Sequence, residues 1–233
     1  MTVRVTPLRG SGAGPDRGVG FALLLCALAL VAMGAAAARW AGAEYVLASF
    51  TTDLENRTQA QRANIAVALE RLDGDVIMPG RSLSFNGTVG RRCVDEGYEP
   101  APGYAAGQVA DTPGGGICQL SSTVYNAALL AGLRIDERAP HARSVRSVGR
   151  GRDAAVVYER SDLRFTNPYT FPVKLRARVV GERLVVEVTG SRPLPAQVTV
   201  RVEESRAAGG VEARLWRRIG TREEMVSADV YPR

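Results

Sequence analysis

Residues 19–38 contain no charged side chain, and this run most strongly limits what the chain can fold into. It is about as long as a helix that spans a bilayer. It is also apolar on every face, which is atypical of a helix packed into a soluble core. Arg4, Arg9 and Arg17 precede the run and only Arg39 directly follows it. This asymmetry favours a cytoplasmic N-terminus and an exported remainder.

The run predicts three parts: a disordered cytoplasmic tail at 1–18, a transmembrane helix or signal sequence at 19–38, and an exported domain at 44–233. The small residues Ala41-Gly42-Ala43 have the form of a signal-peptidase site. We therefore expect a single-pass protein of the cytoplasmic membrane with its C-terminal domain outside, or a secreted protein if cleavage occurs near Ala43.

Composition excludes several functional classes. The chain carries 30 Lys and Arg against 24 Asp and Glu, a formal charge of +6. Without residues 1–43 the balance falls to about +3, and no aromatic and basic pattern accompanies it, so no nucleic-acid partner is expected. Three Cys and one His cannot supply a four-ligand zinc site of the usual kind or a disulfide scaffold. We expect neither a metal nor another cofactor.

The hydrophobic pattern predicts an α+β domain with two main helices packed on a mostly antiparallel sheet, preceded by the transmembrane or signal helix. One helix is expected at 58–72, with apolar residues on one face and Asp73-Gly74 ending it. Residues 97–116 are rich in glycine and are expected to be a loop. Alternating apolar residues predict strands at 44–52, 154–158, 163–166, 173–179, 184–188, 198–202, 214–218 and 223–227.

The second helix is expected to begin beside Cys118, directly after Gly114-Gly115-Gly116, and to end at Gly132. A thiol in the first turn of a helix has a lowered pKa, because the unpaired N–H groups and the helix dipole favour an anion. Glycine lets the backbone approach a substrate closely. The N–H groups of Gly115, Gly116 and Ile117 are therefore candidates for an oxyanion hole.

His141 is the only histidine, so it is the only imidazole that could serve Cys118 as a base. Asp153 and Asp162 are the nearest downstream acids that could orient it. Arg143 and Arg152 belong to an arginine series that is best explained as a solvated β face, with a carboxylate-binding wall as the functional alternative. Residue spacing leaves two other interpretations of Cys118 open: an inert buried thiol, or a disulfide with Cys93.

The motifs closely resemble the VanW family, named for an accessory protein associated with glycopeptide resistance. The most specific is the run GGGICQLSSTVYNAAL at 114–129. Shorter matches are MPG at 78–80, SFN at 84–86, GRDA at 151–154 and DLRFTN at 162–167. The resemblance covers residues 47–190, and the strands expected at 191–233 complete the same domain.

The resemblance implies a bacterial cell-wall protein whose partners are peptidoglycan stem peptides and, through residues 19–38, the membrane. Family members are implicated as atypical L,D-transpeptidases that cross-link these stems through a cysteine thioester, a role that falls here on Cys118. We then expect His141 and Asp153 to complete the catalytic set. The residues expected to bind substrate are Gln119, Ser121, Ser122, Arg143 and Arg152.

Two alternatives stay open. The thioester could be resolved by water, which would make the chain a cysteine amidase or carboxypeptidase acting on peptidoglycan. The chain could instead be a non-catalytic wall-binding accessory protein in which Cys93 and Cys118 form a disulfide.

Overall fold

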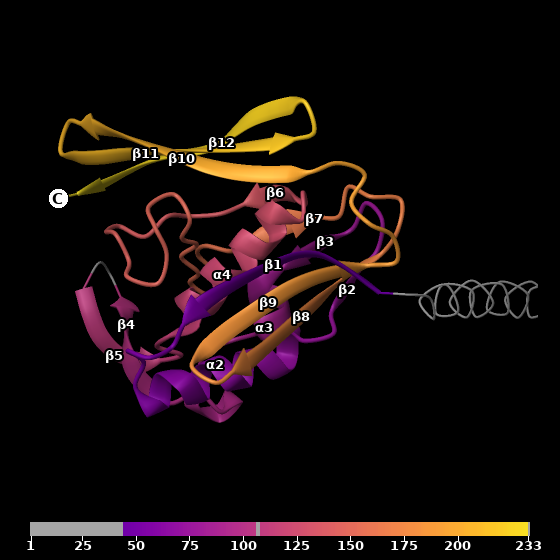
Figure 1. Cartoon of the computed structure of the whole chain (residues 1–233). Coiled ribbons are helices and arrows are strands. Elements are labelled where there is room, and N and C mark those ends of the chain that lie inside the picture. Colours follow the sequence, from indigo (N-terminus) through magenta and orange to yellow (C-terminus); the bar gives the residue numbers. More distant parts are fainter. Residues whose placement is uncertain (1–43, 106–107, 233) are drawn as a thin grey trace, which may run out of the picture. The chain divides into compact units, whose positions relative to one another are not determined.

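The computed structural model describes residues 44–105 and 108–232 (Figure 1). The predicted tail at 1–18 and the apolar run at 19–38 lie outside the described residues. Among the residues that are described, no helix is long and apolar enough to cross a membrane.

The first predicted helix is confirmed as α2, Gln59–Leu72. Thr58 caps its N-terminus: the Gln61 N–H donates to Thr58 Oγ1 at 3.2 Å, and the Thr58 N–H donates to Gln61 Oε1 at 3.1 Å. This reciprocal capping box satisfies two N–H groups that the first turn leaves unpaired. The face with Ile65 and Leu69 is buried, as the pattern predicts.

The second predicted helix is α4, Ile117–Leu130, and it is the central element of the fold. Every residue from 119 to 129 is buried, and the helix contacts β1 (Tyr45–Asp53), β9 (Arg183–Gly190) and β10 (Val198–Ala207). In Figure 1, α4 lies between the sheet that contains β1 and β9 and the sheet formed by the C-terminal strands. Its Ser, Thr and Ala residues keep it narrow enough to be covered on all sides.

The largest sheet has four antiparallel strands in the order β1-β9-β8-β2, where β8 is Val173–Val180 and β2 is Val76–Ile77. The strands predicted at 173–179 and 184–188 are confirmed as the antiparallel pair β8–β9, and the positive φ of 57° at Gly181 between them suits a tight turn. Alternate residues of β8 and β9 point into the core, which explains their period-two pattern.

Three smaller antiparallel sheets complete the domain. They comprise β3 (Ser82–Ser84), β7 (Arg164–Thr166) and β6 (Arg134–Glu137); β4 (Pro100–Ala105) and β5 (Gln108–Pro113); and β10, β11 (Gly210–Ile219) and β12 (Arg222–Pro232). Two short helices, α3 (Phe85–Val89) and the 3-10 turn η1 (Val94–Glu96), lie between β3 and β4. The α+β class with antiparallel pairing is confirmed, although the strands form four sheets instead of one.

Two local predictions are wrong. Residues 97–116 are not all loop, because they contain the β4–β5 hairpin, whose prolines at 100 and 113 pair at its open end, where few ladder hydrogen bonds are needed. Residues 154–158 form no strand and make only the isolated bridges Ala139–Ala155 and Val157–Ser161. The backbone of Ala154 instead pairs with serine side chains of α4.

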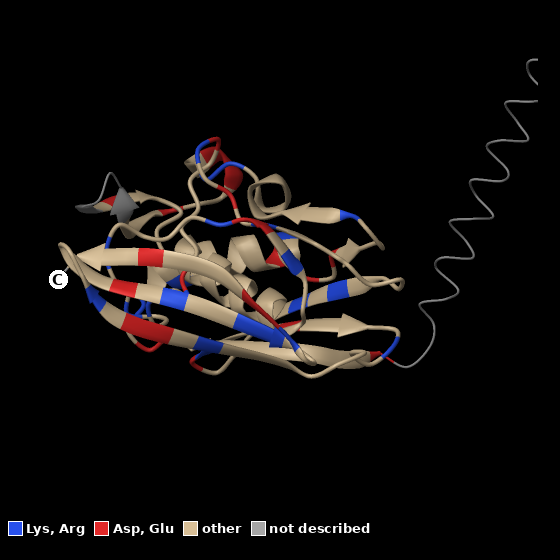
Figure 2. Ribbon diagram, turned by 90° about the horizontal axis from the view of Figure 1, so that it is seen from above, with Lys and Arg blue, Asp and Glu red and all other residues tan. Residues whose placement is uncertain are grey.

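The sheet β10-β11-β12 has two different faces. Its inner face buries Leu215 and Tyr231 against the body of the domain, and the Arg217 Nη1 donates to the carbonyl of Leu133 at 2.6 Å. Figure 2 shows acidic and basic residues interleaved along these strands, where Arg201 pairs with Glu223. The outer face therefore carries both signs of charge side by side.

Candidate functional site

Three consecutive glycines fix where α4 begins. Gly114 and Gly116 have φ values of 85° and 102°, a left-handed conformation that side chains disfavour. Gly115 is packed so closely on β4 that a Cβ there would lie 2.6 Å from the carbonyl carbon of Ala101. The Asn64 Nδ2 donates to the Gly115 carbonyl at 3.1 Å and ties the loop to α2. The glycines are thus required to set the first turn of α4 in place.

Cys118 occupies that first turn as a partly exposed free thiol, with its Sγ 3.7 Å from the carbonyl oxygen of Val156. Burial raises the pKa of this thiol, but its hydrogen bond with His141 and the charge of that ring lower it. The Val156 contact and the charge of Arg92 act in the same direction, and the pKa of Cys118 lies below its usual range. The site therefore favours a thiolate.

His141 and Asp153 form a buried pair. His141 Nδ1 lies 2.6 Å from Asp153 Oδ2, and the backbone N–H of His141 donates to the same oxygen at 2.6 Å. Burial lowers the pKa of His141, but the bonds to Asp153 and Cys118 outweigh it and raise the pKa to about 9. Since Asp153 engages Nδ1, Nε2 is left for the thiol. The arrangement suits a thiolate–imidazolium pair at neutral pH.

The structure thus brings together Cys118, His141 and Asp153. It places Asp162 elsewhere: this carboxylate accepts hydrogen bonds from the Ser84 Oγ at 2.5 Å and from the Asn86 N–H at 2.8 Å, at the start of α3. Of the two acids considered from the sequence, Asp153 orients the imidazole and Asp162 caps a helix.

The spacing of residues in the sequence did not predict the side chains that donate hydrogen bonds to Asp153. The Arg138 Nη2 and the Tyr231 Oη donate to Asp153 Oδ1 at 2.9 and 2.5 Å, and Arg138 also pairs with Asp229. Tyr231 is 78 residues beyond Asp153, and no local pattern marks it. Together with the bonds to His141, these donors satisfy both oxygens of a carboxylate that is only 1% exposed.

Hydrogen bonds within the protein already occupy two of the backbone N–H groups predicted to form the oxyanion hole. The N–H of Gly115 donates to the Thr112 carbonyl at 3.1 Å, and that of Ile117 donates to the Gly114 carbonyl at 3.2 Å. The N–H groups of Gly116 and Cys118 have no acceptor among the described residues. Gly116 and Cys118, rather than Gly115 and Ile117, are therefore the available donors at the helix start.

Gln119, Ser121 and Ser122 were expected to bind substrate, but all three are buried. The Ser122 Oγ donates to the Cys118 carbonyl at 2.6 Å and accepts from the Ala154 N–H at 2.9 Å, while the Ser121 Oγ donates to the Ala154 carbonyl at 2.6 Å. Gln119 donates to the backbone at the end of β1. Burial of satisfied side chains argues against substrate contact, and these residues instead join α4 to its neighbours.

The two predicted arginines lie in different surroundings. Arg152 is partly buried, donates to the side chain of Asn126 and stacks 5.3 Å from the ring of Phe50, so the protein itself engages its charge. Arg143 is exposed. Neither contributes to the lowered pKa of Cys118 in the way that His141 does.

Arg92 was not predicted, yet its charge acts on Cys118. Its Nη2 donates to Asn86 Oδ1 at 2.7 Å, its Nη1 donates to the Gly90 carbonyl at 2.8 Å, and it stacks 5.8 Å from the ring of Tyr158. Arg92 therefore joins the thiol to α3 and to the turn at 157–161.

A polar cavity of about 400 Å³ lies against α3 and this turn. Its lining includes Asn86, Tyr158, Glu159, Arg160, Asp162 and Arg164. Arg92 contacts two of these lining residues, Asn86 and Tyr158, and its charge also acts on Cys118, so one side chain links the cavity to the thiol. Glu159 has a φ of 61°, and it is the one non-glycine residue with a positive φ among the described residues.

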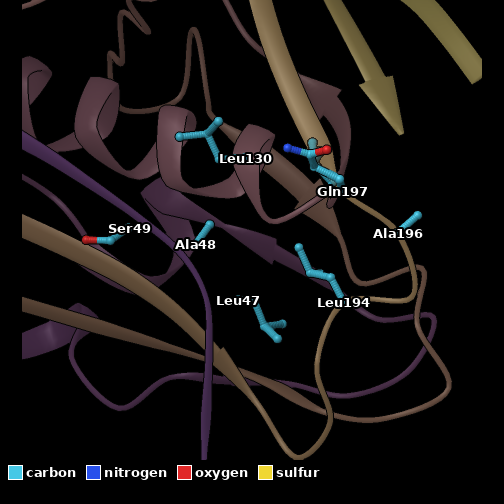
Figure 3. A pocket seen from close by; sticks show the side chains of 8 residues that line it. Leu47, Ala48, Ser49, Leu130, Leu194, Ala196 and Gln197 are labelled. Atoms are coloured by element: carbon cyan, nitrogen blue, oxygen red, sulfur yellow. The ribbon is translucent and has the colours of Figure 1, made fainter. Parts of the chain in front are cut away.

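A second cavity, of about 440 Å³, lies at the other end of α4 (Figure 3). Leu47, Leu130 and Leu194 line it together with Gln197. Cys118 borders neither cavity, and the apolar one is separated from the thiol by the length of the helix.

Cys93 and Cys118 are both free thiols, so the disulfide considered from the sequence does not form in this structure. Within 44–105 and 108–232, no group of three or more His, Cys, Asp and Glu side chains is placed to hold a metal ion. The chemistry available at Cys118 is that of a thiolate, an imidazolium and unpaired backbone N–H groups.

Comparison with known proteins gives one family and one relative. The family described as VanW like protein matches residues 60–189. An uncharacterized protein of Bacillus subtilis (strain 168), YoaR, is 37% identical over 145 residues, which is 62% of this chain and 48% of YoaR. The chain thus spans about half the length of this relative. No solved structure matches significantly.

Proposed function

Since this chain belongs to the VanW family, we propose that its domain is an extracytoplasmic acyltransferase of the L,D-transpeptidase type, acting on peptidoglycan stem peptides. One observation carries the proposal: Cys118 interacts with His141, whose Nδ1 lies 2.6 Å from Asp153. A nucleophile, a base and a group that orients the base are the parts of covalent acyl transfer.

In the proposed first half-reaction, the Cys118 thiolate attacks the carbonyl carbon between the third and fourth residues of a donor tetrapeptide. The N–H groups of Gly116 and Cys118 stabilise the oxyanion. The imidazolium of His141 gives its proton to the leaving nitrogen as the C–N bond breaks. D-alanine departs, and the tripeptide remains on Cys118 as a thioester.

In the second half-reaction, the side-chain amine of an acceptor stem attacks the thioester carbonyl, and neutral His141 accepts the proton that this amine loses. The new amide bond forms as the C–S bond breaks. Cys118 thiolate and the imidazolium are restored, and no oxidant, reductant or metal is consumed.

The polar cavity beside Arg92 is the proposed binding site for the charged part of a stem peptide. Glu159, Arg160 and Arg164 are exposed, and their side chains make no hydrogen bond or ion pair with another described residue. A carboxylate and two guanidinium groups suit a ligand that carries both an ammonium and a carboxylate, as amino-acid termini do. This assignment replaces the buried Gln119, Ser121 and Ser122 as the substrate contacts.

The test incubates the full chain with purified disaccharide-tetrapeptide and identifies the products by mass spectrometry. The proposal requires a cross-linked dimer with loss of D-alanine, and a covalent tripeptide adduct on Cys118. Cys118→Ala should abolish both, whereas the control Cys93→Ala should retain them. Cross-linking by Cys118→Ala would refute the nucleophile assignment, and free tripeptide without a dimer would indicate a hydrolase.

The accessory alternative is tested separately by alkylating the unreduced protein. Alkylation of both Cys93 and Cys118 would support the enzyme proposal, because both are free thiols in the structure. A disulfide that joins them and resists iodoacetamide would favour the non-catalytic protein.

A further inference from the structure

The last strand, β12, reaches into the centre of the domain through Tyr231. This residue is 1% exposed, and its Oη lies 2.5 Å from Asp153 Oδ1. The Gly151 N–H donates to the same Oη at 2.9 Å. The Arg138 Nη2 also donates to this oxygen, at 3.3 Å, so the hydroxyl accepts two bonds and its own proton is directed at the carboxylate.

The phenol of Tyr231 stays protonated in this position. Burial raises its pKa, and the hydrogen bond and negative charge of Asp153 raise it further. Tyr231 is therefore a hydrogen-bond donor to Asp153 at any pH at which the protein would work.

β12 also acts on Asp153 through Arg138. The Arg138 Nη2 donates to Asp153 Oδ1 at 2.9 Å, and its Nη1 pairs with Asp229, two residues before Tyr231. The side chains of Arg138, Asp153 and Asp229 are 4%, 1% and 10% exposed. Such a buried cluster is stable only if its charges are paired and its hydrogen bonds are satisfied.

We propose that Tyr231, on β12, is a positioning residue of the site. Its hydroxyl fixes the Asp153 carboxylate and, through this carboxylate, the ring of His141. A carboxylate rotates easily about its last torsion unless it is held. Arg138 and Tyr231 hold Oδ1, which leaves Oδ2 facing the imidazole. The proposal rests on the acyltransferase function, and it places an essential contact outside residues 60–189, the part matched to the family.

A merely structural role predicts a different outcome, and Tyr169 supplies the matched control. The Tyr169 Oη also donates a hydrogen bond, to the Ala131 carbonyl at 2.7 Å, at the opposite end of α4 from Cys118. Tyr231→Phe and Tyr169→Phe each remove one hydroxyl from the domain. Both should lower stability, but only Tyr231→Phe should change the chemistry of the thiol.

The experiment measures the rate of iodoacetamide alkylation of Cys118 against pH, in the full chain with Cys93→Ala as background. Tyr231→Phe should slow alkylation at pH 7 by about tenfold and move the midpoint of the profile upward. The reason is that a carboxylate no longer held by Tyr231 positions the His141 imidazolium less well beside the thiolate. A tenfold change lies within the range of a hydrogen bond to a charged group. It should also lower kcat for cross-linking while KM is unchanged. Tyr169→Phe should change neither.

Asp229→Asn provides a second variant of nearly unchanged volume and should slow alkylation in the same direction, to a smaller extent. If the profiles of folded Tyr231→Phe and Asp229→Asn both match wild type within twofold, the positioning role is refuted. Alkylation needs no peptidoglycan substrate. A wild-type protein that cross-links nothing, yet shows the Tyr231-dependent profile, would therefore refute the proposed function and support the positioning role.

Discussion

The Nδ1 of His141 lies 2.6 Å from Oδ2 of Asp153, and the backbone N–H of His141 donates to the same oxygen. One carboxylate oxygen therefore fixes both the position of the chain at His141 and the rotation of its ring. This double contact leaves Nε2 for Cys118, and it explains why the pair can carry a charge although both side chains are buried.

The pH dependence of the thiol is the first prediction. Because the pKa of Cys118 lies below its usual range, iodoacetamide should alkylate it with a midpoint at lower pH than that of an ordinary cysteine. In His141→Ala the lowering contribution is lost while burial still raises the pKa, so the midpoint should move upward. An unchanged profile in His141→Ala would show that the imidazole does not act on the thiol.

The rate of cross-linking should also decrease at high pH. Acylation needs a protonated His141, whose pKa is raised to about 9, so kcat/KM should fall as the pH rises through this value. At low pH, kcat/KM should fall as the Cys118 thiolate is protonated. The two apparent pKa values of this profile belong to the coupled Cys118–His141 pair and not to either residue alone. A rate still increasing with pH above 10 would contradict a role for the imidazolium.

Gly115→Ala tests the packing of the glycine loop. The added Cβ would lie 2.6 Å from the carbonyl carbon of Ala101, which is backbone and cannot move aside, so the free energy of unfolding should fall by about 3 kcal/mol. Gly149→Ala is the control, because a Cβ there meets nothing within 4 Å. Chemical denaturation measures both; equal stability of the two variants would disprove the close contact.

Ser122→Ala separates a positioning role from substrate binding. The change leaves the buried Ala154 N–H without its acceptor and removes one of the two hydroxyl donors to the Cys118 carbonyl, which should cost about 1–3 kcal/mol of stability. KM for the tetrapeptide should be unchanged, because Ser122 is buried. A rise in KM with unaltered stability would restore Ser122 as a substrate contact.

The polar cavity is tested by Glu159→Gln and Arg164→Gln, measured as binding of tetrapeptide to the Cys118→Ala background by calorimetry. Each change removes one charge from the cavity lining and should weaken binding by about tenfold, within the range of a charge-assisted hydrogen bond. Arg183→Gln, at the start of β9, is the control and should bind as wild type. Unchanged affinity in both cavity variants would place the peptide elsewhere.

Much of the fold follows from local pattern. The buried face of α2, its end at Asp73-Gly74 and the alternation of β8 and β9 depend on residues that are close in the sequence, so the sequence alone predicts them. The β4–β5 hairpin was missed because its prolines and glycines resemble loop residues. Residues 154–158 alternate like a strand. However, serine side chains of α4, and not a neighbouring strand, make the hydrogen bonds of the Ala154 N–H and carbonyl groups.

The sequence by itself determined that a thiol would begin a helix behind three glycines, and that one histidine could serve it. Only the tertiary structure decided that Asp153 rather than Asp162 orients this histidine, that Ser121 and Ser122 are buried, and that Tyr231 from the last strand completes the cluster. The reason is physical. Helix starts and turns depend on neighbouring residues, whereas a buried carboxylate takes its donors from whatever segments the packing of the whole domain brings to it.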